Sequence, residues 1–245
     1  MNHKIAAIIP YSTNDYKFLR HCIKNLTEIC SQIIVVYSDY FYDGTPENKT
    51  LIKRSIEENP EATFVIQEWQ QGYHPQYWIN KSKVTGYNFV SDKTDYILLI
   101  DTDEIAEQQK FRSFLDSLDT SYNSYCFASY WYFREPSYQA NAVEYPVVMV
   151  RYDKFRYNIL DISRDRQQCM VHPCQEKILI NGDPIFHHYS WVRTEEEMLK
   201  KVSTWGHKFD RNWVDLVKDE FKRPFNGRDF VHGYTYKEVT PLINL

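Results

Sequence analysis

The sequence lacks the features of several protein classes. Its apolar runs are far shorter than the about 20 residues of a membrane-spanning helix, and its N-terminus does not resemble a secretory signal. Glycine is scarce, with 7 among 245 residues, which excludes a glycine-rich disordered chain. Lysine and arginine form no block and the net charge is −4, so the footprint of a nucleic-acid-binding protein is absent. We therefore expect no membrane span and no nucleic-acid partner.

Cysteine usage argues against a disulfide framework. The 5 cysteines are an odd number at irregular spacing. We interpret them as reduced thiols and expect a cytoplasmic protein, because disulfides persist mainly in oxidising compartments. Cys169, His172 and Cys174 lie close together in the sequence. Their spacing matches a zinc site only weakly, so a structural cluster is the simpler interpretation.

Aromatic residues, in contrast, are abundant at 16% of the chain. Such rings can form stacking surfaces for a ligand or ordinary core packing, and both interpretations stay open for most of them. Hydrophobic residues make up 43% and charged residues 25%, as in an ordinary globular protein. The length suits a single domain over residues 1–245.

The most informative segment is Tyr96–Glu104, with the sequence YILLIDTDE. Its first five residues indicate a strand buried on both faces, as in a parallel sheet. Asp101, Thr102 and Asp103 follow directly. Ligands of open α/β sheets bind at the carboxyl ends of strands, and carboxylates there suit a divalent cation shared with substrate phosphates. The alternative is that the two aspartates are polar residues leaving a strand, one of them capping the next helix.

Strand and helix patterns alternate four times in the first half of the chain. We predict buried strands at residues 5–9, 33–36, 63–66 and 96–100. Helices are predicted from Asn14 or Asp15 to about residue 30, from Thr45 as N-cap to the residue before Asn59, and over residues 77–91 and about 105–118. This order predicts a doubly wound, mostly parallel sheet flanked by helices.

The second half is less regular. Strands are predicted at residues 125–133 and 147–152, followed by a charged loop over residues 153–170. A hairpin over residues 177–192 is predicted around Asn181-Gly182. Thr194, followed by three glutamates, is a good start for a helix. Residues 131–134 offer a sugar-stacking wall, although core packing explains their alternate members equally well.

Four short segments, in order, resemble glycosyltransferase family 2 and its relatives of the GT-A fold. Ile8-Ile9-Pro10-Tyr11 resembles the opening strand of that family, and residues 33–39 followed by Asp43-Gly44-Thr45 resemble its acidic loop segment. Asn80-Lys81 resembles its Arg-Asn pair, and Asp101-Thr102-Asp103 matches its Asp-x-Asp motif. The resemblance covers about residues 5–110 and is loose beyond them.

The resemblance implies a fold and an activity. The fold is α/β of the GT-A (Rossmann-like) type, with a mostly parallel central sheet flanked by helices and a smaller mixed C-terminal part. About residues 1–120 would bind the nucleotide sugar and about residues 121–245 the acceptor. The activity is a metal-dependent, inverting transfer of a sugar from a nucleotide-diphosphate donor, with a UDP-sugar favoured. The acceptor is a hydroxyl of a glycan or glycoconjugate, and the cofactor is Mn²⁺ or Mg²⁺.

Donor-binding roles are carried over to this chain by the same resemblance. Asp39 would contact the nucleobase, Pro10 and Tyr11 would shape the nucleotide slot, and Asn80 and Lys81 would approach the diphosphate. Thr102, between the two aspartates, would also contact the donor. A loop carboxylate, a strand end and a solvated helix face are the plainer interpretations of these residues.

Metal and acid–base roles follow the same reasoning. Asp101 would hold the donor's ribose or, through water, the metal, Asp103 would bind the metal directly, and His188 would be a third ligand. A histidine in a strand is more often a structural residue. Glu176 is the first candidate for the base that deprotonates the acceptor hydroxyl, with Asp161 as its rival in the charged loop. Asp165 of the same loop is a further candidate.

Two other functions stay open on the sequence. A phosphatase or nucleotidyltransferase could use the same carboxylates. A haloacid-dehalogenase-like phosphatase, however, carries Asp-x-Asp-x-Thr on a strand near the N-terminus, whereas Asp101 follows the fourth predicted strand. A non-catalytic sugar-nucleotide or glycan-binding protein would bind a donor without transferring its sugar.

Overall fold

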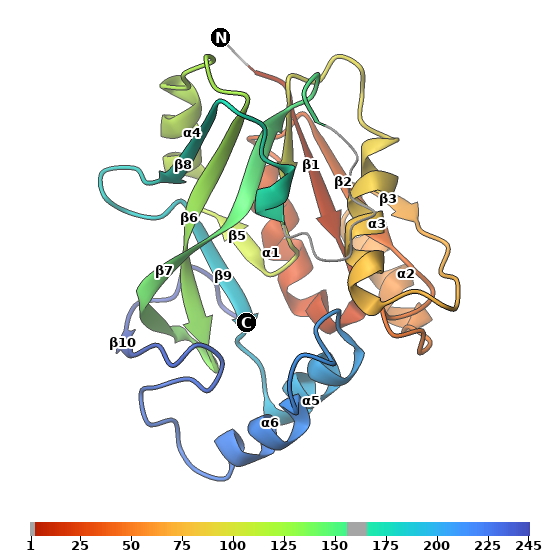
Figure 1. The fold of residues 1–245 in the computed structure, drawn as a ribbon, viewed down its shortest axis with the longest axis vertical. Helices are drawn as coiled ribbons and strands as arrows, with labels where there is room; N and C mark the ends of the chain where they lie inside the picture. Colours follow the sequence, from red (N-terminus) through yellow and green to blue (C-terminus); the bar gives the residue numbers. More distant parts are fainter. Residues whose placement is uncertain (1–2, 156–165) are drawn as a thin grey trace.

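Four parallel strands build one side of a ten-stranded sheet in the computed structural model, which describes residues 3–155 and 166–245 (Figure 1). Every residue of β1 and of β4 is buried, because helices cover both faces of this part of the sheet. The predicted parallel arrangement is thereby confirmed. Side by side, these strands are β3 (Thr63–Ile66), β2 (Gln32–Tyr37), β1 (Ile5–Pro10) and β4 (Tyr96–Leu99).

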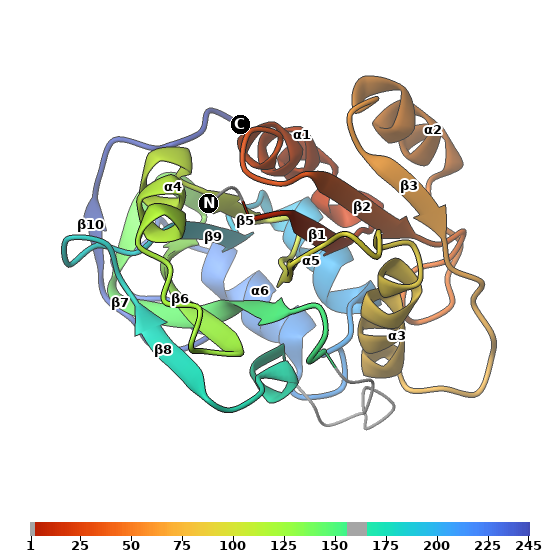
Figure 2. The same cartoon turned by 90° about the horizontal axis from the view of Figure 1, so that it is seen from above.

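Helices cover both faces of these strands (Figure 2). α1 (Tyr16–Leu26), preceded by the short turn η1 (Thr13–Asp15), and α2 (Lys49–Glu58) lie on one face, and α3 (Pro75–Tyr87) lies on the other. Side chains of a strand point alternately to the two faces. Ala7 therefore packs in the cluster that contains α1, and Ile8 packs in the cluster that contains α3.

Gly86 allows α3 to approach the sheet closely. A Cβ atom at this position would lie 2.5 Å from Cγ2 of Ile8 and 3.1 Å from Cγ2 of Val36. Ile8 is fully buried and β-branched, so its side chain cannot rotate away freely. We expect Gly86→Ala to lower the free energy of unfolding by about 1–3 kcal/mol, measured by urea denaturation. Alanine's better helix propensity offsets only about 1 kcal/mol of that cost.

Asn88→Ala is the matched control for this substitution, because Asn88 is exposed at the C-cap of the same helix. It should change the free energy of unfolding by less than about 0.5 kcal/mol. An unchanged urea midpoint for Gly86→Ala would mean that α3 can shift away from the sheet.

The second half of the chain continues the same sheet. β7 (Glu135–Arg151) pairs antiparallel with β4 and with β6 (Ser124–Phe133). β6 then pairs parallel with β9 (Phe186–Trp191), which pairs antiparallel with β5 (Glu104–Ala106). The remaining elements are β8 (Cys174–Ile178), β10 (Tyr236–Glu238), η2 (Arg166–Cys169), α4 (Gln108–Asp116), α5 (Glu195–Thr204) and α6 (Trp213–Phe221).

The helix pair α5 and α6 lies beyond the ends of the central strands, at the lower end of the view in Figure 1. α5 begins as predicted: the Thr194 hydroxyl accepts a hydrogen bond from the N–H of Glu197, whose carboxylate accepts one from the N–H of Thr194. This placement brings residues of the last fifty positions to the edge of the sheet where β4 ends.

Several predicted elements were wrong in detail. α2 is capped by Asn48, whose side chain accepts from the N–H of Leu51, and not by Thr45. Thr45 is instead held in a local turn by the carboxylate of Asp43. Residues 104–106 form β5 and not the start of a helix, because they pair with β9. The strand predicted at residues 147–152 is the end of the longer β7.

The predicted hairpin over residues 177–192 is also wrong. Asn181-Gly182 does form a turn, bridged by Ile180 and Asp183. The flanking strands β8 and β9, however, both pair parallel with β6, one along each part of its length. Within the described residues, no helix is both long enough and apolar enough to cross a membrane.

Candidate functional site

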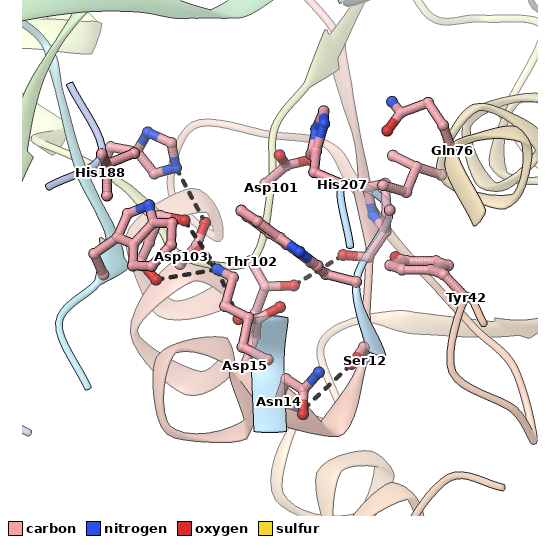
Figure 3. A pocket seen from close by; sticks show the side chains of 18 of the residues that line it. Ser12, Asn14, Asp15, Tyr42, Gln76, Asp101, Thr102, Asp103, His188 and His207 are labelled. Atoms are coloured by element: carbon pink, nitrogen blue, oxygen red, sulfur yellow. Dashed lines mark hydrogen bonds and ion pairs between the residues drawn. The ribbon is translucent and has the colours of Figure 1, made fainter. Parts of the chain in front are cut away.

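A cavity of about 560 Å³ lies where β1 and β4 end (Figure 3). This volume is typical of pockets that bind small molecules. Both halves of the chain contribute to its lining. Pro10 comes from β1, and Asp101 and Asp103 follow β4. The lining continues with Trp131, Glu144, His188, Lys201, Trp205, Gly206, His207, Asp210 and Arg211.

Asp101 presents a carboxylate to this cavity. The residue follows β4, and its N–H donates a hydrogen bond of 2.7 Å to Oε2 of Glu104. The Asp101 side chain is 38% exposed, and its Oδ2 lies 3.2 Å from Nη2 of Arg166. An anchored backbone and an open carboxylate leave Asp101 able to contact a ligand directly.

Glu104 and Arg166 form a buried ion pair beneath Asp101. Glu104 is fully buried, and the two guanidinium nitrogens of Arg166 each lie 2.6 Å from one of its oxygens. Burial raises the pKa of Glu104, and Arg166 opposes that shift. The bidentate geometry orients Arg166 so that the same side chain also reaches Asp101.

Asp103 is surrounded by cationic groups. Only 4% of the residue is exposed, and its Oδ2 lies 2.9 Å from Nζ of Lys201 and 3.5 Å from Nη2 of Arg193. Its Oδ1 lies 3.4 Å from Nε2 of His188. Burial alone would raise its pKa, but Lys201, His188 and Arg193 hold the pKa of Asp103 well below its usual range. Asp103 is therefore ionised at neutral pH.

His188 lies between acidic groups on the other side of Asp103. Burial opposes its charged form, but the neighbouring carboxylates of Asp103, Glu144 and Glu104 raise the pKa of His188 to about 10. The imidazole is therefore protonated at neutral pH. Because a protonated imidazole has no lone pair to give to a metal, His188 would have to release a proton to coordinate one.

The donor set fits a divalent ion that is completed by a substrate. No group of three His, Cys, Asp or Glu side chains in residues 3–155 and 166–245 is arranged to hold an ion without other ligands. Mg²⁺-type ions at phosphate sites, however, are commonly held by one or two carboxylates together with phosphate oxygens. Asp101 and Asp103 supply such a pair at the cavity.

Three predicted donor contacts lie at the ends of β1 and β4. Pro10 lines the cavity, and its carbonyl accepts a hydrogen bond of 2.9 Å from the hydroxyl of Thr102. That bond occupies the Thr102 hydroxyl inside the fold. Tyr11 is buried outside the cavity lining, and its hydroxyl lies 2.6 Å from Oγ of Ser55 on α2.

The other predicted donor residues do not line the cavity. Asp39 is partly exposed in the loop after β2, and Lys81 is partly exposed on α3. Asn80 is buried, and its Oδ1 accepts a hydrogen bond of 3.1 Å from Nζ of Lys83. Lys83 lines the cavity in place of Lys81, because two residues along a helix turn a side chain to the opposite side.

Glu176, the first predicted base, does not line the cavity. Glu176 is exposed on β8, outside the cavity lining, with its Oε1 3.8 Å from Sγ of Cys174. Asp161 and Asp165 fall outside the described residues, so the structure says nothing about their positions.

Several charged residues that meet at or next to the cavity were not predicted from the sequence. One of them carried a detectable signal: Lys201 lies three residues after the buried Met198, on the inward face of α5. The others come from distant segments with no shared pattern. They are Lys83, Glu144 and Arg166, which line the cavity, and Arg193, which contacts Asp103.

Comparisons with known proteins concern the fold. No family model and no curated protein matches this sequence. A mannosyltransferase from Pyrobaculum calidifontis, solved with GDP-Man and Mn²⁺, is similar with a TM-score of 0.50 and 9% identity over 83% of this chain. The match spans 62% of that chain, which is less than two thirds of it.

Two further solved structures are similar at lower scores. The inositol-1-phosphate CTP transferase from T. maritima has a TM-score of 0.47 and 10% identity, covering 89% of this chain and 98% of its own. Glucosyl-3-phosphoglycerate synthase from Mycobacterium tuberculosis has a TM-score of 0.45 and 12% identity, covering 98% and 87%. The sheet order and the mannosyltransferase likeness together confirm the predicted GT-A-like α/β fold.

Proposed function

We propose that this protein is a metal-dependent glycosyltransferase. It would move a sugar from a nucleoside-diphosphate donor, with UDP favoured, to a hydroxyl of a glycan or glycoconjugate. One observation carries the proposal: Asp101 and Asp103 follow a central parallel strand and reach a cavity of ligand size. The similar mannosyltransferase was solved with GDP-Man and Mn²⁺, which makes nucleotide sugars and this ion the first ligands to test.

The carboxylates and cations of the cavity have complementary roles in this proposal. Asp101 and Asp103 would hold Mn²⁺ or Mg²⁺, and the bound ion would supply Lewis-acid stabilisation of the leaving diphosphate. Arg166 orients Asp101 and keeps Glu104 paired, while Lys201 keeps Asp103 ionised. His188 would become a ligand only after it releases its proton.

The remaining donor contacts stay proposals. Pro10 and Thr102 lie at the edge that the donor would occupy. Four of the predicted residues lie outside the cavity lining: Asp39, Lys81, Asn80 and Tyr11. Asp39 and Lys81 would contact a donor only if its nucleoside extended past the cavity. For Asn80 and Tyr11, both buried, an indirect role in supporting the cavity wall is the simpler proposal. The division into a donor half over residues 1–120 and an acceptor half over residues 121–245 is likewise proposed.

A thermal-shift screen tests the proposed function. We expect one UDP- or GDP-linked sugar to raise the melting temperature strongly with Mn²⁺ and weakly without it. A ligand at a hundredfold excess over its dissociation constant adds about 2.7 kcal/mol to the free energy of unfolding. Asp101→Asn should remove the Mn²⁺-dependent part of the shift. Because the Asp101 side chain is 38% exposed, this variant should lose less than about 1 kcal/mol of unliganded stability.

Asp116→Asn is the matched control, because Asp116 is exposed on α4 away from the cavity lining. It should keep the full Mn²⁺-dependent shift. An equal shift in Asp101→Asn would contradict the metal assignment. Release of pyrophosphate from a nucleoside triphosphate and a sugar phosphate would instead identify a nucleotidyltransferase, and donor binding without transfer to any acceptor would identify a binding protein.

A further inference from the structure

Glu144 differs from Asp101, Asp103 and Glu104 in the groups that its carboxylate contacts. Asp101 and Glu104 pair with Arg166, and Asp103 pairs with Lys201. Glu144, in contrast, forms no ion pair with a lysine or arginine in the described part of the chain, and its neighbours there are two histidines, one of them the protonated His188, and a tyrosine. Its carboxylate oxygens lie 3.3 Å from Nε2 of His232, 3.5 Å from the hydroxyl of Tyr234 and 3.8 Å from Nδ1 of His188.

The sheet places Glu144 close to the proposed metal pair. Glu144 on β7 lies opposite Ser129 of β6, and His188 on β9 lies opposite Trp131 of β6. Residues two apart on a strand share a face, so all four side chains lie on one face of the sheet. His188 contacts Asp103 through Nε2 and Glu144 through Nδ1. One imidazole ring therefore separates the carboxylate of Asp103 from that of Glu144.

Aromatic rings line the part of the cavity that extends from Glu144 to α5 and α6. The ring centroid of Trp131 lies 5.0 Å from that of His232, and those of Trp205 and Trp213 lie 5.3 Å apart. Trp205 is partly exposed, and its buried Nε1 has no hydrogen-bond partner among the described residues. Rings beside a carboxylate suit a sugar, because a pyranose presents an apolar face of C–H groups and hydroxyls at its edge.

We propose that the end of the cavity at Trp205 and Trp213 is the acceptor subsite and that this subsite binds a pyranose sugar. Glu144 accepts the proton of the sugar hydroxyl that attacks the donor. This inference rests on the proposed glycosyl transfer. The acceptor oxygen forms a bond to the anomeric carbon of the donor while that carbon's bond to the diphosphate oxygen breaks. The electron pair of the broken bond leaves with the nucleoside diphosphate, and the hydroxyl proton passes to Glu144.

Matched glutamine variants of the full chain test the role of Glu144. Transfer is measured as nucleoside diphosphate released from UDP- and GDP-sugars with Mn²⁺ and a panel of methyl pyranosides as acceptors. Glu144→Gln keeps the shape of the side chain but cannot take up the proton, so kcat should fall by about 10²- to 10⁴-fold. The donor-induced thermal shift should be unchanged. Glu135→Gln, at an exposed position of the same strand, should keep full activity.

Two further variants separate a base from a structural residue. Formate should restore part of the activity of Glu144→Ala, because a small carboxylate can take the vacated place, whereas it would not repair a structural defect. Glu176→Gln tests the base that the sequence favours. Full kcat in Glu144→Gln, or a loss of donor-dependent transfer confined to Glu176→Gln, would overturn the assignment of Glu144 and leave the proposed function standing.

The acceptor subsite is tested separately from transfer. Methyl pyranosides are titrated against the full chain, with UDP and Mn²⁺ present and absent, and binding is followed by tryptophan fluorescence. Trp205→Ala should weaken binding by about 2- to 10-fold, the loss of one aromatic contact. Absence of pyranoside binding, or equal binding by Trp205→Ala, would overturn the subsite. Pyranoside binding by a protein that no donor stabilises would support the subsite while overturning the proposed transfer and the role of Glu144.

Discussion

Replacing Asp103 with alanine is expected to lower the free energy of unfolding by about 3–5 kcal/mol, because buried Lys201 would lose its nearest counter-charge and Arg193 would keep Asp15 as its acidic partner. Lys201 lies 2.9 Å and Arg193 3.5 Å from the Asp103 carboxylate, and the Arg193 side chain is fully buried. For a chain of this size the melting temperature should fall by about 6–20 °C. Differential scanning calorimetry and urea denaturation measure the effect directly.

Asp116→Ala is the control for this loss, since Asp116 is exposed. It should stay within about 0.5 kcal/mol of the parent chain. A loss below about 1 kcal/mol for Asp103→Ala would show that the ion pairs of Asp103 contribute as little to stability as solvent-exposed ion pairs do. The expected loss also affects how function is tested: a missing Mn²⁺ response in Asp103→Ala would not separate metal binding from damaged structure, whereas Asp101→Asn does.

Replacing Arg166 with methionine should have a comparable effect, a loss of about 3–5 kcal/mol, because buried Glu104 would lose its bidentate partner and keep His188, 4.0 Å away, as a cationic neighbour. Glu104 is fully buried, and both of its oxygens accept hydrogen bonds of 2.6 Å from Arg166. Burial already raises the pKa of Glu104, and removal of Arg166 should raise it further. Urea denaturation of the variant beside the parent chain measures the loss.

The pH dependence of this loss identifies its cause. A buried Glu104 that has lost Arg166 and has a raised pKa takes up a proton more readily in the folded chain than in the unfolded one. The deficit of Arg166→Met should therefore be full at about pH 8 and shrink as the pH falls toward the ordinary glutamate pKa of about 4.3. The double variant with Glu104→Gln, which carries no charge at either position of the pair, should recover part of the stability at about pH 8. A deficit that is independent of pH would point to lost packing of the Arg166 stem.

Part of the fold could be read from local patterns. The apolar runs at residues 5–9 and 96–100 predict strands buried on both faces, and β1 and β4 are such strands. Thr194 and the glutamates after it predict the start of α5, which the capping box confirms. These features depend on neighbours within a few residues, so the chain itself specifies them. The position of Asp101 and Asp103 at the end of a central strand follows from the same local pattern.

Other parts of the fold depend on pairing between distant segments. Residues 104–106 carry a helix-compatible pattern, yet they pair with β9 as β5. The predicted hairpin fails because β6 is long enough to pair with both β8 and β9. Neither outcome can be read from a window of neighbouring residues, since the deciding hydrogen bonds join segments far apart in the chain.

The sequence by itself determined the parallel strands, the acidic motif that follows one of them and the class of ligand that such a motif suits. Only the tertiary structure decided which charges meet there. Lys201 reaches Asp103 across 98 positions of the chain, and Arg166 reaches Glu104 across 62. A buried charge must have a partner, but any cation that the fold brings close enough will satisfy it, so the identity of that partner is a property of the folded chain.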